Sequence, residues 1–297
     1  MDFGINLGFA IKRWPLPQEW AAVVRDELGL DLVQFSFDLL DPWWPDHHRL
    51  AAHTRAAADD YGIRIHSAQV GLAKYTYNGL LHPDPDARAA SVEWWRRGID
   101  VATELGCVAM GGPVGAITVP ELAQPGVRER RYAELLDTMA ELSEHGQAAG
   151  LESLLVEPTP LVREIPSSID EAERLARDLE MRCALPVRYV LDVGHALYQP
   201  LYGESSNLGD WLRPLARHVG VLHLQNTDFQ SDSHWGWPDE RGVFDVEGFA
   251  ADVRAAELRE VPVFLELFDA FEADDDRVLR QTATSVEHCK GALTASA

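Results

Sequence analysis

The sequence predicts an α/β fold, a single (β/α)8 TIM barrel that occupies residues 1–297 as one domain. Three observations support this prediction. The length of 297 residues suits one barrel of roughly 250 residues with extended loops. Short β-rich segments alternate with longer helical segments, which is the rhythm of parallel β–α units. No Pro/Ser-rich linker or low-complexity tract divides the chain.

Eight segments are apolar enough to form strands that are buried on both faces, as parallel strands are. In chain order they are residues 3–9, 32–37, 63–69, 108–111, 153–157, 188–192, 220–224 and 261–266. Helical segments between them often begin at Ser, Asp or Pro, and they include residues 18–27, 48–60, 87–104, 128–149 and 168–178. Four of these helices are followed by a closing glycine, namely Gly29, Gly62, Gly106 and Gly150. Eight such units close into a barrel more readily than they form an open sheet.

The charge of the chain limits its partners. There are 26 Lys and Arg residues against 48 Asp and Glu residues, a formal net charge of −22. Such a surface repels nucleic-acid phosphates and anionic membranes, so we expect neither as a partner, and a small-molecule substrate is left. No export signal and no run of about 18 apolar residues is present, which predicts a cytoplasmic protein.

The three cysteines do not indicate a disulfide or zinc framework. Cys107, Cys183 and Cys289 are odd in number, widely separated and without a C-x-x-C pair. We expect all three to be reduced and buried.

Four candidate metal ligands end consecutive predicted strands. They are Glu157, Asp192, His223 and Glu266, and each follows an apolar run. A single carboxylate at a strand end more often caps a helix or pairs with an arginine. Four such groups at one end of a barrel would be strongly desolvated without a cation, so we predict a divalent metal site. Three carboxylates and one imidazole suit manganese, magnesium, cobalt or zinc.

On these residues the chain resembles the xylose-isomerase-like barrels of sugar isomerases and 3-epimerases over nearly its whole length. Glu157, the segment Asp192-Val193-Gly194-His195, His223 and Glu266 look like the metal and substrate set of that family, in the same order and on the same strands. Further segments are similar to the tetrulose-phosphate 3-epimerase branch: 9–14, 157–160 with Arg163-Glu164, and 223–228 followed by His234-Trp235.

The resemblance implies one divalent ion, with manganese as the first choice and magnesium, cobalt or zinc as alternatives. The ion would chelate the carbonyl and a neighbouring hydroxyl of a small ketose or ketose phosphate, and so stabilise an enediolate. Glu157 and Glu266 would be the catalytic pair, one removing a proton and the other returning it. Return to the opposite face gives epimerisation, and return to the neighbouring carbon gives isomerisation. Family members are often dimers or tetramers, so a homo-oligomer is expected.

Several residues are candidates for holding the substrate, each with a structural alternative. His195 would hydrogen-bond a substrate oxygen, or else pack in its loop. His66 is expected to end the third strand, where it would donate to a substrate hydroxyl or to a backbone carbonyl. Glu164 would hold a substrate hydroxyl or a metal-bound water, or pair with Arg163. His234 completes the set after the seventh strand.

A phosphate site is suggested only by Lys12 and Arg13, directly after the first strand, which could hold an anion or form a solvated surface pair. The family commonly places an arginine shortly after the His of strand seven, and this chain has Phe229 and Gln230 there instead.

Aromatic residues follow many of the predicted strands. Trp14 follows the first, and the others are Trp43, Trp44, Tyr75, Tyr77, Trp235, Trp237, Phe268 and Phe271. Such rings can cover the C–H faces of a sugar and exclude water, or they can pack on each other or at a subunit interface. Trp94 and Trp95 lie in the middle of a helix and are expected to be ordinary packing residues.

Other functions remain open on the sequence. The strongest rival is a zinc phosphodiesterase of the endonuclease-IV type, because Asp232-Ser233-His234 looks like its Asp-x-His pair. By that resemblance, the endonuclease-IV-type site needs a histidine at the end of strand four. This chain has Gly111 and Gly112 there, so the match is incomplete. Keto-inositol dehydratases and C-glycoside-cleaving barrels use nearly the same ligands. A noncatalytic sugar-binding barrel would need no intact set of ligands.

Overall fold

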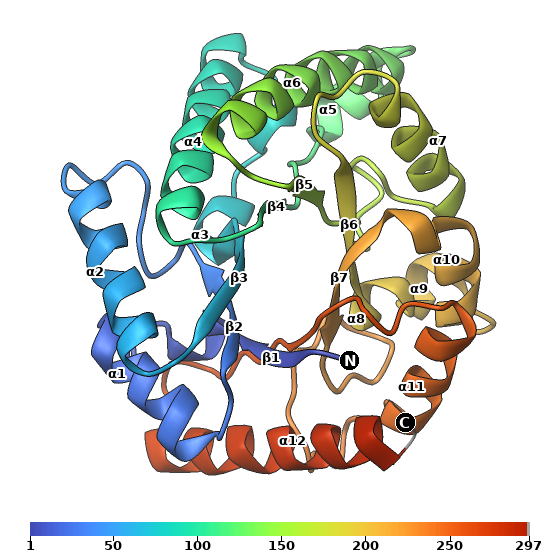
Figure 1. The fold of residues 1–297 in the computed structure, drawn as a ribbon. Helices are drawn as coiled ribbons and strands as arrows, with labels where there is room; N and C mark the ends of the chain where they lie inside the picture. Colours follow the sequence, from blue (N-terminus) through green and yellow to red (C-terminus); the bar gives the residue numbers. More distant parts are fainter. Residues whose placement is uncertain (296–297) are drawn as a thin grey trace. The chain divides into compact units, whose positions relative to one another are not determined.

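The structure is a computed structural model that describes residues 1–295. Its strands follow one another in chain order around a closed barrel (Figure 1). They are β1 (Phe3–Asn6), β2 (Leu32–Ser36), β3 (Arg64–Gln69), β4 (Ala109–Gly112), β5 (Ser153–Val156), β6 (Val187–Asp192), β7 (Val219–Leu224) and β8 (Val263–Leu265). All eight predicted strands are confirmed, and every strand pair whose register is described is parallel.

The first strand is shorter than expected. Residues 7–10 form a 3-10 turn in place of the end of β1, and all four of its residues are buried. The side chain of Asn6 accepts a hydrogen bond from the Gly8 backbone N–H at 2.7 Å, which starts this turn. The apolar run 3–9 therefore contains a strand and a buried turn, two structures that hydrophobicity alone does not separate.

The chain is organised as two compact units, each built from segments that are distant in the sequence. The first unit contains residues 1–34, 56–64 and 191 onward, and the second contains residues 35–55 and 65–190.

In the first unit, β1 pairs with β2 and with β8, and β8 pairs with β7. Its helices are α1 (Pro17–Ala22), which continues as a π-helical turn over Val23–Glu27, then α8 (Val193–Ala196), α9 (Gln199–Tyr202), α10 (Leu208–Leu215), α11 (Val246–Ala255) and α12 (Asp275–Ala295). Helix α11 packs against both α10 and α12 (Figure 1). The carboxyl ends of β6, β7 and β8 carry Asp192, His223 and Glu266, so this unit positions three of the predicted ligands.

In the second unit, β4 pairs with β3 and with β5, and β5 pairs with β6. Its helices are α3 (Gly71–Tyr75), α4 (Pro85–Glu104), α5 (Val119–Leu122), α6 (Val127–Ala149) and α7 (Ile169–Glu180). Helix α2 (His47–Asp60) begins in this unit. The two long helices α4 and α6 lie side by side (Figure 1).

Capping signals in the sequence account for the helix ends. The Asp84 side chain accepts hydrogen bonds from the backbone of Asp86 and Ala87, and Pro85 occupies the first helical position of α4. Helix α6 ends at Gly150, whose φ of 100° is a left-handed conformation that favours glycine.

The cysteine prediction is confirmed in part. All three cysteines are free, and Cys107 and Cys289 are buried, but Cys183 is only half-buried. Among the described residues, no helix is long and apolar enough to cross a membrane.

Candidate active site

Three of the predicted ligands meet in the first unit. The candidate ligand atoms of Asp192, His223 and Glu266 all lie within 4.8 Å of one another. His223 Nδ1 is 3.0 Å from Glu266 Oε2 and 3.7 Å from Asp192 Oδ2. All three residues are buried, with at most 6% of the surface of each exposed. Two carboxylates and one imidazole are therefore held together away from water.

A chain of side-chain amides fixes how His223 presents its ring nitrogens. The Gly8 backbone N–H donates to Asn6 Oδ1, so Asn6 Nδ2 is the donor to Gln34 Oε1 at 2.7 Å. Gln34 Oε1 must then also be the acceptor for His223 Nε2, which lies 2.7 Å away. With its proton on Nε2, neutral His223 directs the lone pair of Nδ1 toward the carboxylates of Asp192 and Glu266.

The same surroundings orient the two carboxylates. Asp192 Oδ1 accepts from Gln225 Nε2 at 2.6 Å and from the His195 backbone N–H at 2.9 Å. Glu266 Oε1 accepts from Asn6 Nδ2 at 2.9 Å. Asp192 Oδ2 is buried and has no hydrogen-bond partner among residues 1–295.

These contacts fit a divalent cation. The Nδ1 lone pair and a carboxylate oxygen repel each other unless a positive charge lies between them, and Asp192 Oδ2 is left without any donor. Oxygen and imidazole ligands whose other polar atoms are hydrogen-bonded are the arrangement that hard divalent ions take in proteins.

Two further histidines flank this group. His195 Nε2 lies 3.1 Å and His234 Nε2 lies 3.4 Å from the same oxygen, Asp232 Oδ1. His234 Nδ1 is 3.5 Å from Glu266 Oε2. Burial lowers the pKa of His234, but the hydrogen bond to Asp232 and the nearby carboxylates raise it to about 9. His195 and His234 therefore lie together beside these ligands, and Asp232 joins them.

The fourth predicted ligand, Glu157, lies in the second unit. It directly follows β5 and is buried, and Gln69 Nε2 donates a hydrogen bond to its Oε2. The backbone N–H of Glu157 donates to the Gly112 carbonyl at 3.1 Å. Gln69 ends β3 and Glu157 follows β5, so the ends of the two strands that flank β4 place an amide on a buried carboxylate.

Glu164 is buried in the loop after β5, where its backbone forms an isolated antiparallel β-bridge with Ala116. The expected alternative partner, Arg163, donates instead to the Ile117 carbonyl at 3.0 Å.

The expectation that His66 ends the third strand is wrong. Strand β3 continues to Gln69, so His66 lies three residues before its end. Because side chains alternate along a strand, His66 faces the opposite side from Gln69. The residue that contacts Glu157 is Gln69, the last residue of the predicted segment 63–69, where the role was assigned to His66 instead.

All three residues proposed after strand one contact other side chains of the protein. Arg13 donates to Asp275 Oδ1 at 3.0 Å and to the Ala270 carbonyl at 2.7 Å, and its side chain is 5% exposed. It is therefore neither an unpaired phosphate ligand nor a solvated surface residue. Lys12 Nζ lies over the ring of Phe271, 4.4 Å from its centroid. Trp14 lies against Phe9, with ring centroids 5.9 Å apart.

Five functional neighbours were not predicted from the sequence: Asn6, Gln34, Gln69, Gln225 and Asp232. Four are neutral amides within or just after strands, a residue type that gives no distinctive signal. The sequence indicates Asp232 only as half of an Asp-x-His pair. A polar amide inside an otherwise apolar strand is the signal that could have indicated Asn6 and Gln34.

A comparison with protein families adds to this geometry. The profile described as "Xylose isomerase-like TIM barrel" matches residues 22–287. The chain belongs to this family.

Individual xylose isomerase-like relatives agree with the family match. D-erythrulose 1-phosphate 3-epimerase of Brucella abortus (strain 2308) is 24% identical over 294 residues, which cover 96% of this chain and 94% of the relative. A crystal structure from Rhodospirillum rubrum ATCC 11170, provisionally titled a xylose isomerase, is 37% identical, with a TM-score of 0.94 and coverage of 98% and 99%. D-psicose 3-epimerase from Clostridium cellulolyticum H10, solved with D-tagatose, is 15% identical with a TM-score of 0.75, and 99% of each chain is covered. The predicted resemblance to sugar isomerases and 3-epimerases is confirmed.

Proposed function

We propose that this xylose isomerase-like protein is a divalent-metal-dependent epimerase or isomerase of a small ketose or ketose phosphate. One observation carries the proposal above all others. The amide chain from Gly8 through Asn6 and Gln34 sets His223 with its Nδ1 lone pair toward the carboxylates of Asp192 and Glu266. A bound cation would stabilise this arrangement of ligand atoms.

Glu157 is proposed as the fourth ligand. It is buried and directly follows β5, the strand that precedes β6, β7 and β8 in the barrel order. Three carboxylates and one imidazole would hold manganese first, with magnesium, cobalt and zinc as alternatives. A bound divalent ion would supply the positive charge that makes the C–H next to a ketone more acidic.

The two glutamates are proposed to move the proton. Glu266 has Oε1 fixed by Asn6, and Glu157 has Oε2 fixed by Gln69, so each carboxylate is held in one orientation. A neighbouring divalent cation favours the ionised form of a carboxylate, so Glu266 would be ionised and able to accept a proton. One glutamate would remove the proton beside the carbonyl and the other would return it.

His195 and His234 are proposed to hold the substrate oxygens. Their shared contact with Asp232 orients both rings, and the raised pKa of His234 makes it a cationic donor at neutral pH. A cationic histidine could take the place of the arginine that this chain lacks after strand seven. The Brucella relative is named for a tetrulose phosphate, which makes D-erythrulose 1-phosphate the first substrate to try.

Proton exchange in deuterated water tests this function directly. Protein loaded with manganese is incubated with D-erythrulose 1-phosphate and with free tetruloses and pentuloses, and deuterium in the recovered sugar is located by NMR. We expect incorporation at C3 that stops when a chelator removes the metal. Deuterium only at C1 would indicate isomerisation rather than epimerisation. Absence of exchange from every ketose, with metal shown to be bound, would overturn the proposal.

A zinc phosphodiesterase is the second candidate, because of one observation. Asp192, His195 and His234 form a second group whose candidate ligand atoms lie within 4.8 Å of one another. A site that binds more than one zinc ion would suit phosphate ester hydrolysis. Cleavage of abasic DNA by the zinc-loaded protein, without ketose exchange, would favour this function.

A further inference from the structure

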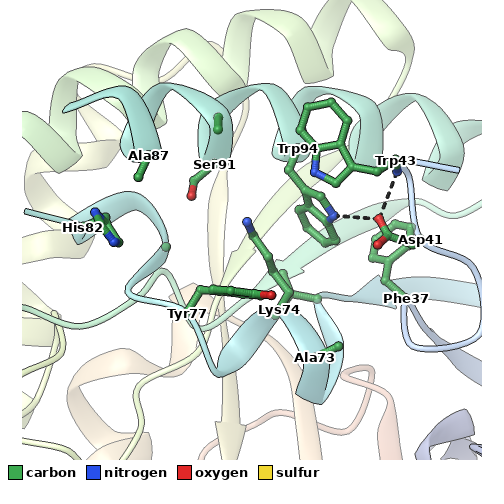
Figure 2. A pocket seen from close by; sticks show the side chains of 13 residues that line it. Phe37, Asp41, Trp43, Ala73, Lys74, Tyr77, His82, Ala87, Ser91 and Trp94 are labelled. Atoms are coloured by element: carbon green, nitrogen blue, oxygen red, sulfur yellow. Dashed lines mark hydrogen bonds between the residues drawn. The ribbon is translucent and has the colours of Figure 1, made fainter. Parts of the chain in front are cut away.

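A second pocket, outside the active site described above, lies between the segments after β2 and β3 and helix α4. Its volume is about 340 Å³, which is within the range of small-molecule sites. Figure 2 shows its lining, which includes Phe37, Lys74, Tyr77, Ser91 and Trp94. All of its residues belong to the second unit. None of them is a candidate metal ligand.

The pocket contains a lysine without an anionic partner. Lys74 Nζ lies 5.1 Å from the ring centroid of Trp94 and 5.6 Å from that of Tyr77. It makes no hydrogen bond and no ion pair within 4.0 Å among the described residues. The nearest acidic group that acts on it, Asp41, already accepts from the Trp43 backbone N–H at 2.9 Å and from Trp94 Nε1 at 3.2 Å. Lys74 therefore presents an ammonium group against two aromatic faces.

A buried hydroxyl points into the same space. Ser91 is only 6% exposed, and its side chain has no hydrogen-bond partner in the part of the chain that the structure describes. In Figure 2 the Ser91 hydroxyl and the Lys74 amine both face the interior of the pocket. Most buried hydroxyls are hydrogen-bonded, and a serine in a helix usually bonds to its own backbone. Ser91 is thus available to a ligand.

His82 adds a third polar group. Its Nδ1 accepts a hydrogen bond from the Asp84 backbone N–H at 3.1 Å, so the proton of the neutral ring is on Nε2. That nitrogen is then a donor at the pocket wall. Hydrogen-bond donors from Lys74, Ser91 and His82 thus line the same pocket.

The fold fixes the position of the lysine. Asp38, after β2, accepts from the backbone N–H groups of Leu72 and Ala73 at 2.7 and 2.8 Å and so anchors the start of α3. Gly71 has a φ of 79°, and a Cβ there would come within 2.6 Å of the Asp38 carboxylate. The close approach requires glycine, and it places Lys74 on a helix tied to the neighbouring strand end.

We propose that this pocket binds a small ring-bearing monocarboxylate, with the carboxylate at Lys74 and Ser91 and the ring against Trp94 and Tyr77. One ammonium group, with Asp41 close by and a chain charge of −22, matches one negative charge better than the two of a phosphate monoester. The rings of Phe37, Trp43, Tyr77 and Trp94 line the pocket, and such walls favour the flat face of a ring. This binding site does not depend on the proposed epimerase activity.

Benzoate is the probe that tests the site, titrated into the full-length metal-loaded protein by calorimetry and ligand-observed NMR. We expect saturable binding with a Kd of about 1 mM or tighter. Benzyl alcohol, the neutral analogue, should bind at least about 10-fold more weakly, because a charged hydrogen bond is lost.

Variants then locate the bound benzoate. Lys74→Met should weaken binding at least about 10-fold and Ser91→Ala roughly 3-fold. Lys290→Met, which removes a lysine bonded to the Gly29 carbonyl, should leave benzoate affinity unchanged. Asp192→Asn should also leave it unchanged, which separates this pocket from the metal site. Thermal melting of each variant confirms that it is folded.

Any one of four results would overturn the inference. Two concern the variants: equal benzoate affinity in Lys74→Met, and loss of binding in Asp192→Asn. The other two are absence of saturable benzoate binding and equal affinity for benzyl alcohol, which would exclude a carboxylate site.

Discussion

The candidate metal site and the pocket that contains Lys74 and Ser91, here called the α3–α4 pocket, treat their buried polar groups in opposite ways. At the metal site every ligand has a second contact that fixes it: Asp192 is held by Gln225, Glu266 by Asn6 and His223 by Gln34. In the pocket, Lys74 and Ser91 have no hydrogen bonds among the described residues, and aromatic rings provide the walls. The metal site is therefore preorganised for one charge and geometry, whereas the pocket can adapt its donors to a ligand.

Removing one carboxylate should affect the metal site most. Glu266→Gln keeps the volume of the side chain but cannot accept a proton, so we expect ketose proton exchange to fall about 10³-fold. Deuterium incorporation followed by NMR measures this rate. Glu260→Gln, on an exposed residue, is the matched control and should exchange at the normal rate. A loss below about tenfold for Glu266→Gln would mean that it is not a catalytic base.

Removing the metal should destabilise the preorganised site and leave the pocket unaffected. A metal present at 100 times its Kd stabilises the folded protein by about 2.7 kcal/mol. For a chain of this length that corresponds to a Tm decrease of roughly 4 °C on chelation, measured by calorimetry. The shift should be absent in Asp192→Asn. Loss of benzoate binding after chelation would contradict the separation of the two sites.

Removing one side-chain amide tests whether the hydrogen bonds that orient the ligands contribute to metal affinity. Asn6→Ala removes the donor to Gln34 and Glu266, and we expect metal affinity to fall 10–100-fold, since partners of this kind typically contribute about that much. Competition with a chromogenic chelator measures the affinity. Asn207→Ala, at the start of α10, removes an asparagine that only caps a helix and should not change metal affinity. Equal affinities in both variants would show that the amide chain is dispensable.

The smallest effect is expected at Lys74. Burial lowers its pKa below the ordinary value of 10.5, and Asp41 opposes this only in part. The folded state then binds the proton less tightly than the unfolded state, so the charge costs stability at pH 7, and that cost fades as pH rises toward 10.5. Lys74→Met should therefore raise stability at pH 7 by less than about 1 kcal/mol, because part of the side chain stays in water.

Melting of ligand-free Lys74→Met at pH 7 and at about pH 10.5 measures this difference. Lys290→Met, the control, should show no such gain at neutral pH. A Lys74→Met protein that melts lower than the wild type at pH 7 would indicate that Lys74 has a stabilising partner.

Much of the site could be predicted because local sequence determines where strands end. Asp192 and Glu266 follow apolar runs and His223 lies within the last residues of one, so their positions were recognisable without tertiary contacts. The prediction failed in the choice of residue within a strand. The predicted segment 63–69 ends at Gln69 as β3 does, but the role was assigned to His66, three residues earlier, because a neutral amide gives no distinctive signal.

Other residues could not be assigned because their partners are distant in the sequence. Arg13 appeared to be an unpaired cation, but it bonds Asp275, 262 residues away. Trp94 was expected to be ordinary packing, and it is buried, yet one of its faces also lines the α3–α4 pocket. A mid-helix tryptophan gives the same helical periodicity in both situations.

The sequence by itself determined the order of strands and helices, the ends of the helices and the residue types available for a metal. These depend on side-chain alternation, helix periodicity and capping, which act over a few residues. Tertiary structure alone decided the tautomer of His223, because Gln34, its partner, is 189 residues away. Tertiary structure also places Lys74 and Ser91 in the lining of the same pocket, because α3 carries one and α4 carries the other.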